Sequence, residues 1–190
     1  MTRRIDGAGF QSKFAASDDP WACRTSRSEA VKRRRAFAGL PLVSSALDVA
    51  CGDGAGTRDI AARALRTDAV DEAAAALASA ARLIGDDPRV RLRRARLPDR
   101  LPRGRWRRIV VSELVYYLAP HQIAALADAV VARLEPGGVL IAVHHLVRFD
   151  DARTPPAQAA ALFHSRLAHA LDLISSHRFG RYGVVKWRRR

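Results

Sequence analysis

The chain has 190 residues, of which 48% are hydrophobic and 27% charged. This length suits one domain of ordinary size with a sizeable core, which excludes disorder throughout. Two cysteines, Cys23 and Cys51, are too few for a disulfide framework or a structural zinc site. No apolar run approaches the roughly 20 residues that span a bilayer, and the first residues lack a signal-peptide core. We therefore expect a soluble, cytoplasmic protein with no membrane partner.

The net charge of +14 comes almost entirely from arginine, which supplies thirty of the 33 basic residues. Eleven arginines lie between residues 82 and 108, where three aspartates oppose them. Such a patch raises nucleic acid as a partner. The aromatic content of 6%, however, offers few side chains on which bases could stack. We expect a solvated basic face that assists an anionic ligand, in preference to a dedicated nucleic-acid surface.

Apolar strand-like runs alternate with alanine-rich helical stretches, a pattern typical of β-α units and a mainly parallel sheet. Residues 1–20 are polar and are expected to form a flexible arm, and a basic helix is expected over 26–40 with Ser28 as its N-cap. Later strands are expected at 46–50, 65–70, 90–94, 108–112, 139–144 and 182–187. Later helices are expected at 56–64 and 72–83, from Pro120 until Pro136 ends it, and after Pro156 to near Ser175.

One segment carries a ligand-binding pattern, because the expected strand 46–50 runs into Cys51-Gly52-Asp53-Gly54 and then into a helix. Glycine at 52 and 54 permits a tight turn against which a flat or charged ligand can lie. Asp71 follows seventeen residues later, where nucleoside-binding α/β folds place a carboxylate on the ribose hydroxyls. Neither a phosphate-cradling loop nor the third glycine of the dinucleotide pattern is present. The pattern therefore favours a nucleoside without a pyrophosphate.

This segment resembles motif I of the class I S-adenosylmethionine-dependent methyltransferases, with Ala50 where that family most often has a glycine. The likeness extends to the branch of nodulation protein S, whose members N-methylate the amino sugar of a chitooligosaccharide. The matching pieces are Asp48, Gly52, Gly54 and Asp71, then Asp19-Pro20-Trp21, Thr25-Ser26, Glu29 and Lys32, Leu97-Pro98, the run SELVYYL from Ser112 to Leu118, Pro136 to Leu140, and the histidine after that strand.

The resemblance implies a Rossmann-like α/β domain over 1–190, with a seven-stranded, mostly parallel sheet and helices on both faces. It also implies S-adenosyl-L-methionine as the cofactor, with residues 1–40 as an amino-terminal arm and helix that cover the site. The residues expected to bind the cofactor are Trp21, Asp48, Ala50, Cys51, Gly52, Gly54, Asp71, Arg96, Leu97 and Ser112. Within this set, Asp48 is expected to anchor the glycine turn through backbone N–H groups. Asp68 is the fallback for Asp71 and is otherwise expected to face solvent.

Three positions depart from the pattern of the branch. Arg96 stands where an acid would read the adenine amino group, so Asp99 or a backbone carbonyl must take over that role or affinity for the cofactor falls. Arg107 stands where an acid follows the aromatic residue, and Ser28 stands where an aromatic residue precedes Glu29. The two arginines keep open a degenerate, non-catalytic relative.

The candidates for proton transfer follow the fourth and fifth strands: Glu113, Tyr117, His144 and His145. Alternation places the two histidines on opposite faces, so at most one is expected to face a substrate. No metal is expected. The expected reaction is an in-line displacement on nitrogen or oxygen of a small-molecule acceptor, such as an amino sugar or a natural-product intermediate. An RNA-directed methyltransferase or basic nucleic-acid binder is the alternative from another class.

Overall fold

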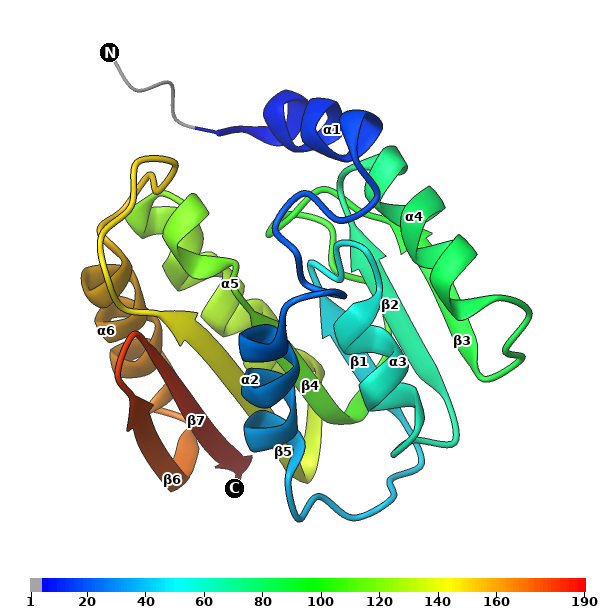
Figure 1. Ribbon diagram of the computed structural model, residues 1–190. Coiled ribbons are helices and arrows are strands. Elements are labelled where there is room, and N and C mark those ends of the chain that lie inside the picture. The colour runs from blue at the N-terminus through cyan, green and yellow to red at the C-terminus, as the bar shows by residue number, and fades with distance from the viewer. Residues whose placement is uncertain (1–4) are drawn as a thin grey trace.

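The computed structural model describes residues 5–190, and its centre is a seven-stranded sheet in the order β3-β2-β1-β4-β5-β7-β6 (Figure 1). Strands β1 to β5 are parallel, whereas β7 runs antiparallel to both β5 and β6. The expected Rossmann-like fold with a mostly parallel sheet is confirmed. The strands are β1 (Ala46–Val49), β2 (Thr67–Asp71), β3 (Val90–Arg94), β4 (Trp106–Ser112), β5 (Leu134–His145), β6 (Leu171–Phe179) and β7 (Tyr182–Arg189).

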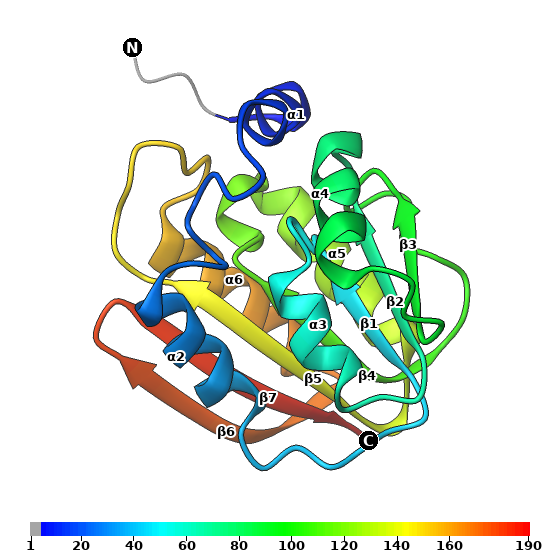
Figure 2. The same ribbon diagram turned by 45° about the vertical axis from the view of Figure 1, so that its right-hand side comes forward.

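Helices cover both faces of the sheet. Figures 1 and 2 show α2, α3 and α4 over one face and α5 and α6 over the other. All four residues of β1 are buried, as expected for a central parallel strand covered on both sides. The helices are α1 (Gly7–Ala16), α2 (Arg27–Phe37), α3 (Ala55–Ala61), α4 (Ala74–Ile84), α5 (Pro120–Arg133) and α6 (Pro156–Leu167), with a 3-10 turn at Val115–Tyr117. Within residues 5–190, every helix is too short or too polar to span a bilayer.

The register of the central strands sets the position of the functional site. In β1, Val49 lies opposite Val70 of β2 on one side and opposite Val111 of β4 on the other. The three strands therefore end side by side, and the residues that follow them gather at the carboxyl ends of the strands, here called the sheet edge. Open α/β sheets bind ligands at these carboxyl ends.

The prediction of a flexible arm over residues 1–20 is wrong for residues 7–16, which form α1. Asp6 caps this helix by accepting a bond from the Gly9 amide at 2.9 Å. Phe10 and Phe14, one helical turn apart, pack against Trp21 with ring centroids 5.8 and 5.4 Å away. The helix thus depends on apolar partners that its own sequence does not supply. Residues 1–4 of the predicted arm lie outside the described residues.

Other boundaries also differ from the prediction. Ser26, not Ser28, caps α2, because Ser26 keeps extended backbone while Ser28 already lies within the helix. Strand β5 begins at Leu134, inside the helix expected from Pro120 to Pro136, and its register with β4 shifts between Trp106 and Arg108. The prediction of helix continuing to Ser175 is wrong, because the chain from Leu171 forms β6 and pairs with β7.

Candidate functional site

A cavity of about 570 Å³ lies at the carboxyl ends of β1, β2, β4 and β5. This volume is within the range of small-molecule sites. One wall comes from residues 5–26, the segment before α2, which we call the arm. It contributes Phe10, Phe14, Trp21 and Cys23. Figure 1 shows the arm passing over the sheet, with α1 beside α4. The cavity is therefore formed between the sheet edge and the arm.

Nine of the ten residues expected to bind a cofactor line this cavity: Trp21, Asp48, Ala50, Cys51, Gly52, Asp71, Arg96, Leu97 and Ser112. The tenth, Gly54, is absent from the lining within residues 5–190. A Cβ on Gly54 would lie 2.9 Å from the Cβ of Ala80 in α4, and its φ is +82°. Gly54 is thus required for helix packing and turn geometry, and its contact with a ligand stays a prediction.

Asp71 is the acid that the turn and the following helix hold in place. Its Oδ2 accepts a hydrogen bond from the Gly52 amide at 3.0 Å, and its Oδ1 accepts one from the Ala73 amide at 2.9 Å. Burial raises the pKa of Asp71, while these amides oppose the rise. A carboxylate has about four acceptor positions, so lone pairs remain for ligand hydroxyls.

Two other aspartates have partners that the sequence did not reveal. Within residues 5–190, the expected hydrogen bonds from backbone N–H groups to Asp48 are absent. Instead its Oδ2 accepts from the Thr57 hydroxyl at 2.7 Å, and burial raises its pKa to about 7. Asp68 does not face solvent but is 3% exposed and accepts from Trp106 Nε1 at 2.9 Å. The reason is topological, because β2 lies between β1 and β3 and is not an edge strand.

The two arginines that replace expected acids differ in position. Arg96 lines the cavity with a side chain that is 73% exposed, and it lies 3.9 Å from Asp99. Asp99 itself is absent from the lining described for residues 5–190. Arg107 lies at the other end of β4, where it donates to the Pro136 carbonyl at 2.7 Å. Only the change at Arg96 therefore concerns the cavity.

Glu113 is the centre of a charged network that the sequence did not predict. The Lys32 ammonium lies 2.6 Å from Glu113 and 2.7 Å from Glu29. Glu113 also accepts from the Tyr116 hydroxyl and from the His145 amide, the latter at 3.0 Å. Burial alone would lower the pKa of Lys32, but the two glutamates raise it overall. Glu113 therefore fixes its neighbours, and the Glu29 and Lys32 spacing was the only sequence signal for this network.

The two histidines lie on opposite faces, as the alternation predicted. His144 is 1% exposed and packs in the core against Phe163 and His164, with centroids 5.7 and 5.1 Å away. The prediction of His144 as a candidate for proton transfer is wrong, because its side chain is buried beneath α6 and does not line the cavity within residues 5–190. His145 does line the cavity, and burial lowers its pKa. A neutral imidazole at this wall can accept a proton.

Aromatic rings form the cavity wall next to His145. Tyr117 packs edge-on against Phe10 at 4.9 Å and lies 6.0 Å from Phe149, which in turn lies 5.6 Å from His145. Burial raises the pKa of Tyr117, so its phenol stays protonated at neutral pH and is available as a hydrogen-bond donor. Ring faces of this kind attract cationic groups.

The charge of the lining is opposite in sign to that of the whole chain. Among the described residues that line the cavity, nine are acidic and four are basic, whereas the chain carries a net charge of +14. The acidic residues are Asp6, Asp19, Glu29, Asp48, Asp53, Asp71, Glu72, Glu113 and Asp151; the basic residues are Lys32, Arg33, Arg96 and Arg153. The cavity therefore favours ligands that carry positive charge.

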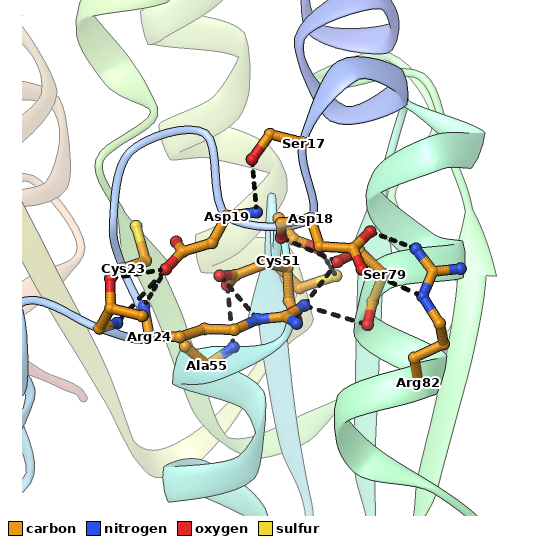
Figure 3. A network of polar contacts seen from close by, with 12 residues as sticks. Ser17, Asp18, Asp19, Cys23, Arg24, Cys51, Ala55, Ser79 and Arg82 are labelled. Carbon is orange, nitrogen blue, oxygen red and sulfur yellow. Dashed lines mark hydrogen bonds and ion pairs between the residues drawn. The ribbon is translucent and has the colours of Figure 1, made fainter.

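Asp19, Cys23 and Asp53 bring their potential ligand atoms within 4.8 Å of one another. Asp53 is already paired with Arg24 at 3.1 Å, and burial raises the pKa of the Cys23 thiol to about 12. A metal ion would thus meet a protonated thiol and an arginine. Figure 3 shows Asp19 and Cys23 on the arm, with Cys23 to the left of Cys51 of the turn. The Oδ1 atom of Asp19 is buried without a partner among residues 5–190, which suits a cationic group of an organic ligand.

Comparison with known proteins is consistent with this architecture. A family model described as a methyltransferase domain matches residues 46–138. The N-methyltransferase NodS from Bradyrhizobium japonicum, solved with S-adenosyl-L-homocysteine, has 19% identity and a TM-score of 0.80, covering 96% of this chain and 97% of that one. A putative methyltransferase from Pseudomonas syringae has 29% identity and a TM-score of 0.74, with coverages of 86% and 100%.

A third solved structure, DhpI in complex with S-adenosyl-L-homocysteine, has 20% identity and a TM-score of 0.76, covering 96% of this chain and 94% of that one. None of the curated proteins is significantly similar to the chain in sequence. The matches to NodS and DhpI therefore describe the fold, while the family model and the Pseudomonas protein add similarity in sequence.

Proposed function

Because the chain is an S-adenosylmethionine-dependent methyltransferase with a NodS-like class I fold, we propose that it methylates an amine nitrogen of a small acceptor. The observation that carries this proposal is the negative charge of the cavity inside a strongly basic protein. Carboxylates and aromatic faces both favour a positively charged group. An amine acceptor, such as an amino sugar, suits this environment better than an anionic one.

The cavity residues fit S-adenosylmethionine. Asp71 would accept hydrogen bonds from the ribose hydroxyls. The Oδ1 atom of Asp19, which has no partner among residues 5–190, would accept one from the ammonium group of the cofactor. When bound, the cofactor supplies an activated methyl group on a sulfonium, which the acceptor nitrogen takes by in-line displacement. Ala50, Cys51 and Gly52 form the turn against which the nucleoside would lie.

The chain's own residues prepare the acceptor. His145 would take the proton that an ammonium must lose before its lone pair is free to attack. Glu113 binds the backbone amide of His145 and so fixes its position, and the protonated Tyr117 would donate a hydrogen bond to the acceptor. Holding two reactants in line is worth roughly 7 to 11 kcal/mol in favourable systems. Proton transfer therefore assists a reaction that depends mainly on orientation.

Titration calorimetry with S-adenosylhomocysteine tests the cofactor site. We expect Asp71→Ala to weaken binding by tenfold or more, because the ribose hydroxyls lose their charged acceptor. Asp172→Ala is the matched control, since Asp172 is an exposed aspartate on the edge strand β6. Absence of binding to the wild-type chain at millimolar ligand would contradict the proposal.

The acceptor class is tested separately. Oligosaccharides with a free amine and their N-acetylated counterparts would be incubated with the cofactor, and products measured by mass spectrometry. We expect methylation only where the amine is free. Methylation of both forms, or of hydroxyl groups alone, would contradict an amine acceptor while leaving the cofactor site intact.

A further inference from the structure

Arg24 attaches the arm to the sheet edge at a buried point. Its Nε lies 3.1 Å from Asp53 Oδ2, and its Nη2 donates to the Asp53 carbonyl at 2.8 Å. The same Nη2 donates to the carbonyl of Ser79 in α4 at 3.1 Å and to the Ser79 hydroxyl. The side chains of Arg24 and Asp53 are 20% and 7% exposed. One guanidinium therefore joins the arm, the glycine turn and α4.

Ser79 binds the arm a second time. Its hydroxyl donates to the Asp18 carbonyl at 2.9 Å, and its side chain is fully buried. Asp18 and Arg24 are thus fixed at one place on α4, as Figure 3 shows. The short segment between them contains Asp19, Trp21 and Cys23, all of which line the cavity. The position of this cavity wall therefore depends on the Arg24 and Ser79 contacts.

Asp53 links the same point to the opposite wall. Its Oδ1 accepts from the Ala55 amide at 3.0 Å and so fixes the first turn of α3, next to Gly52. Arg24 binds the other carboxylate oxygen, so the arm and the glycine turn share one buried ion pair. Displacing the arm would break this ion pair, in which the Asp53 side chain is 7% exposed while the arm is in place.

A second arginine contact between the arm and α4 differs in exposure. Arg82 pairs with Asp18, but the two side chains are 57% and 52% exposed. Exposed pairs contribute little because water and salt screen them, whereas charge-assisted bonds out of water are stronger. Arg24 is therefore the stronger of these two attachments of the arm.

We propose that Arg24 is a positioning residue that holds the arm closed over bound S-adenosylmethionine and sets its rate of dissociation. This inference rests on the proposed function, because it places the cofactor beneath the arm. In this proposal, a ligand between the arm and the carboxyl ends of the strands leaves when the arm moves, and that movement breaks the Arg24 contacts. The rate of release should then depend on Arg24 more strongly than the rate of association.

Stopped-flow measurement of S-adenosylhomocysteine dissociation tests this proposal. We expect Arg24→Ala to raise the dissociation rate tenfold or more and to change the association rate less than threefold. Ser79→Ala removes one hydroxyl that serves both Asp18 and Arg24, and we expect an increase of about threefold. Arg82→Ala, the exposed contact on the same helix, should stay within twofold of the wild type.

Hydrogen exchange gives a readout that a general loss of stability would not reproduce. In Arg24→Ala, amides of residues 7–25 should exchange faster, while those of β1 and β4 keep wild-type protection. A wild-type dissociation rate in Arg24→Ala, or equal effects of Arg24→Ala and Arg82→Ala, would overturn the proposal. If Arg24→Ala does not fold, Ser79→Ala decides, and a wild-type rate in that variant overturns it. Failure of the wild-type chain to bind at all would instead overturn the proposed function, and this inference with it.

Discussion

The cavity and the surface around the outermost strand β3 carry opposite charge within one chain. Nine acidic and four basic described residues line the cavity. On the edge strand β3, by contrast, Arg91, Arg93 and Arg94 are exposed, and Arg100 and Arg103 in the loop that follows are exposed as well. Arg91, Arg100 and Arg103 form no ion pair within residues 5–190. The net charge of the sequence therefore describes the surface and gives no indication of the ligand site.

The first prediction concerns the buried cation of the cavity. Lys32→Met would leave Glu29 and Glu113 facing each other without a positive charge, so we expect the free energy of unfolding to fall by about 3 kcal/mol. Urea denaturation measures this. Arg27→Met, on the exposed side of the same helix, should change stability by less than about 0.5 kcal/mol. Equal losses in the two variants would mean that buried and surface cations do not differ in this chain.

The second prediction concerns His145. In the proposed mechanism the neutral form of His145 accepts the proton, and burial places its pKa below the ordinary value of 6.5. The value of kcat/KM should therefore fall as the pH drops through the lowered pKa. His145→Asn should lower kcat/KM about tenfold and remove this acid limb. His121→Asn, an exposed histidine at the start of α5, should keep the wild-type profile; an acid limb that persists in His145→Asn would assign the titration to another group.

The smallest effect is expected at the surface around β3. The triple variant Arg91→Ser, Arg100→Ser and Arg103→Ser should keep its affinity for S-adenosylhomocysteine within twofold, because these side chains lie outside the cavity lining. The same variant should elute from heparin at lower salt, since fewer cations contact the polyanion. A large loss of cofactor affinity would show that this surface contributes to the site. Methyl transfer to RNA that the triple variant loses would favour the nucleic-acid alternative.

The part of the site that residues close in sequence build could be predicted from the sequence. The segment from Ala46 to Gly54 specifies strand and turn locally, and Asp71 ends the next strand, as predicted. The network around Glu113 could not be predicted, because Lys32 lies 81 residues away in the chain. Likewise, the Arg24 contact to Ser79 spans 55 residues. Such pairs arise only when the fold brings α2, α4 and the arm to the same sheet edge.

The errors in the predicted secondary structure also come from contacts between residues far apart in the sequence. The helix after Pro156 is expected to continue to near Ser175, because the residues from Leu171 have no regular alternation, yet pairing with β7 makes Leu171–Phe179 a strand. In α1, Phe10 and Phe14 give a weak apolar face until Trp21 folds against them. Tertiary partners override local preference most easily at edges and termini, where the intrinsic signal is weak.

The close approach of Gly54 to Ala80 constrains how this sequence can change. A Cβ at 54 would lie 2.9 Å from the Cβ of Ala80, and the α4 backbone at Ala80 is 3.0 Å away. A larger residue at 80 would push α4 from the glycine turn, and any side chain at 54 would also be strained by its positive φ. In a lineage of such proteins, the two positions should remain small together, because Ala80 sets the distance between α4 and the glycine turn.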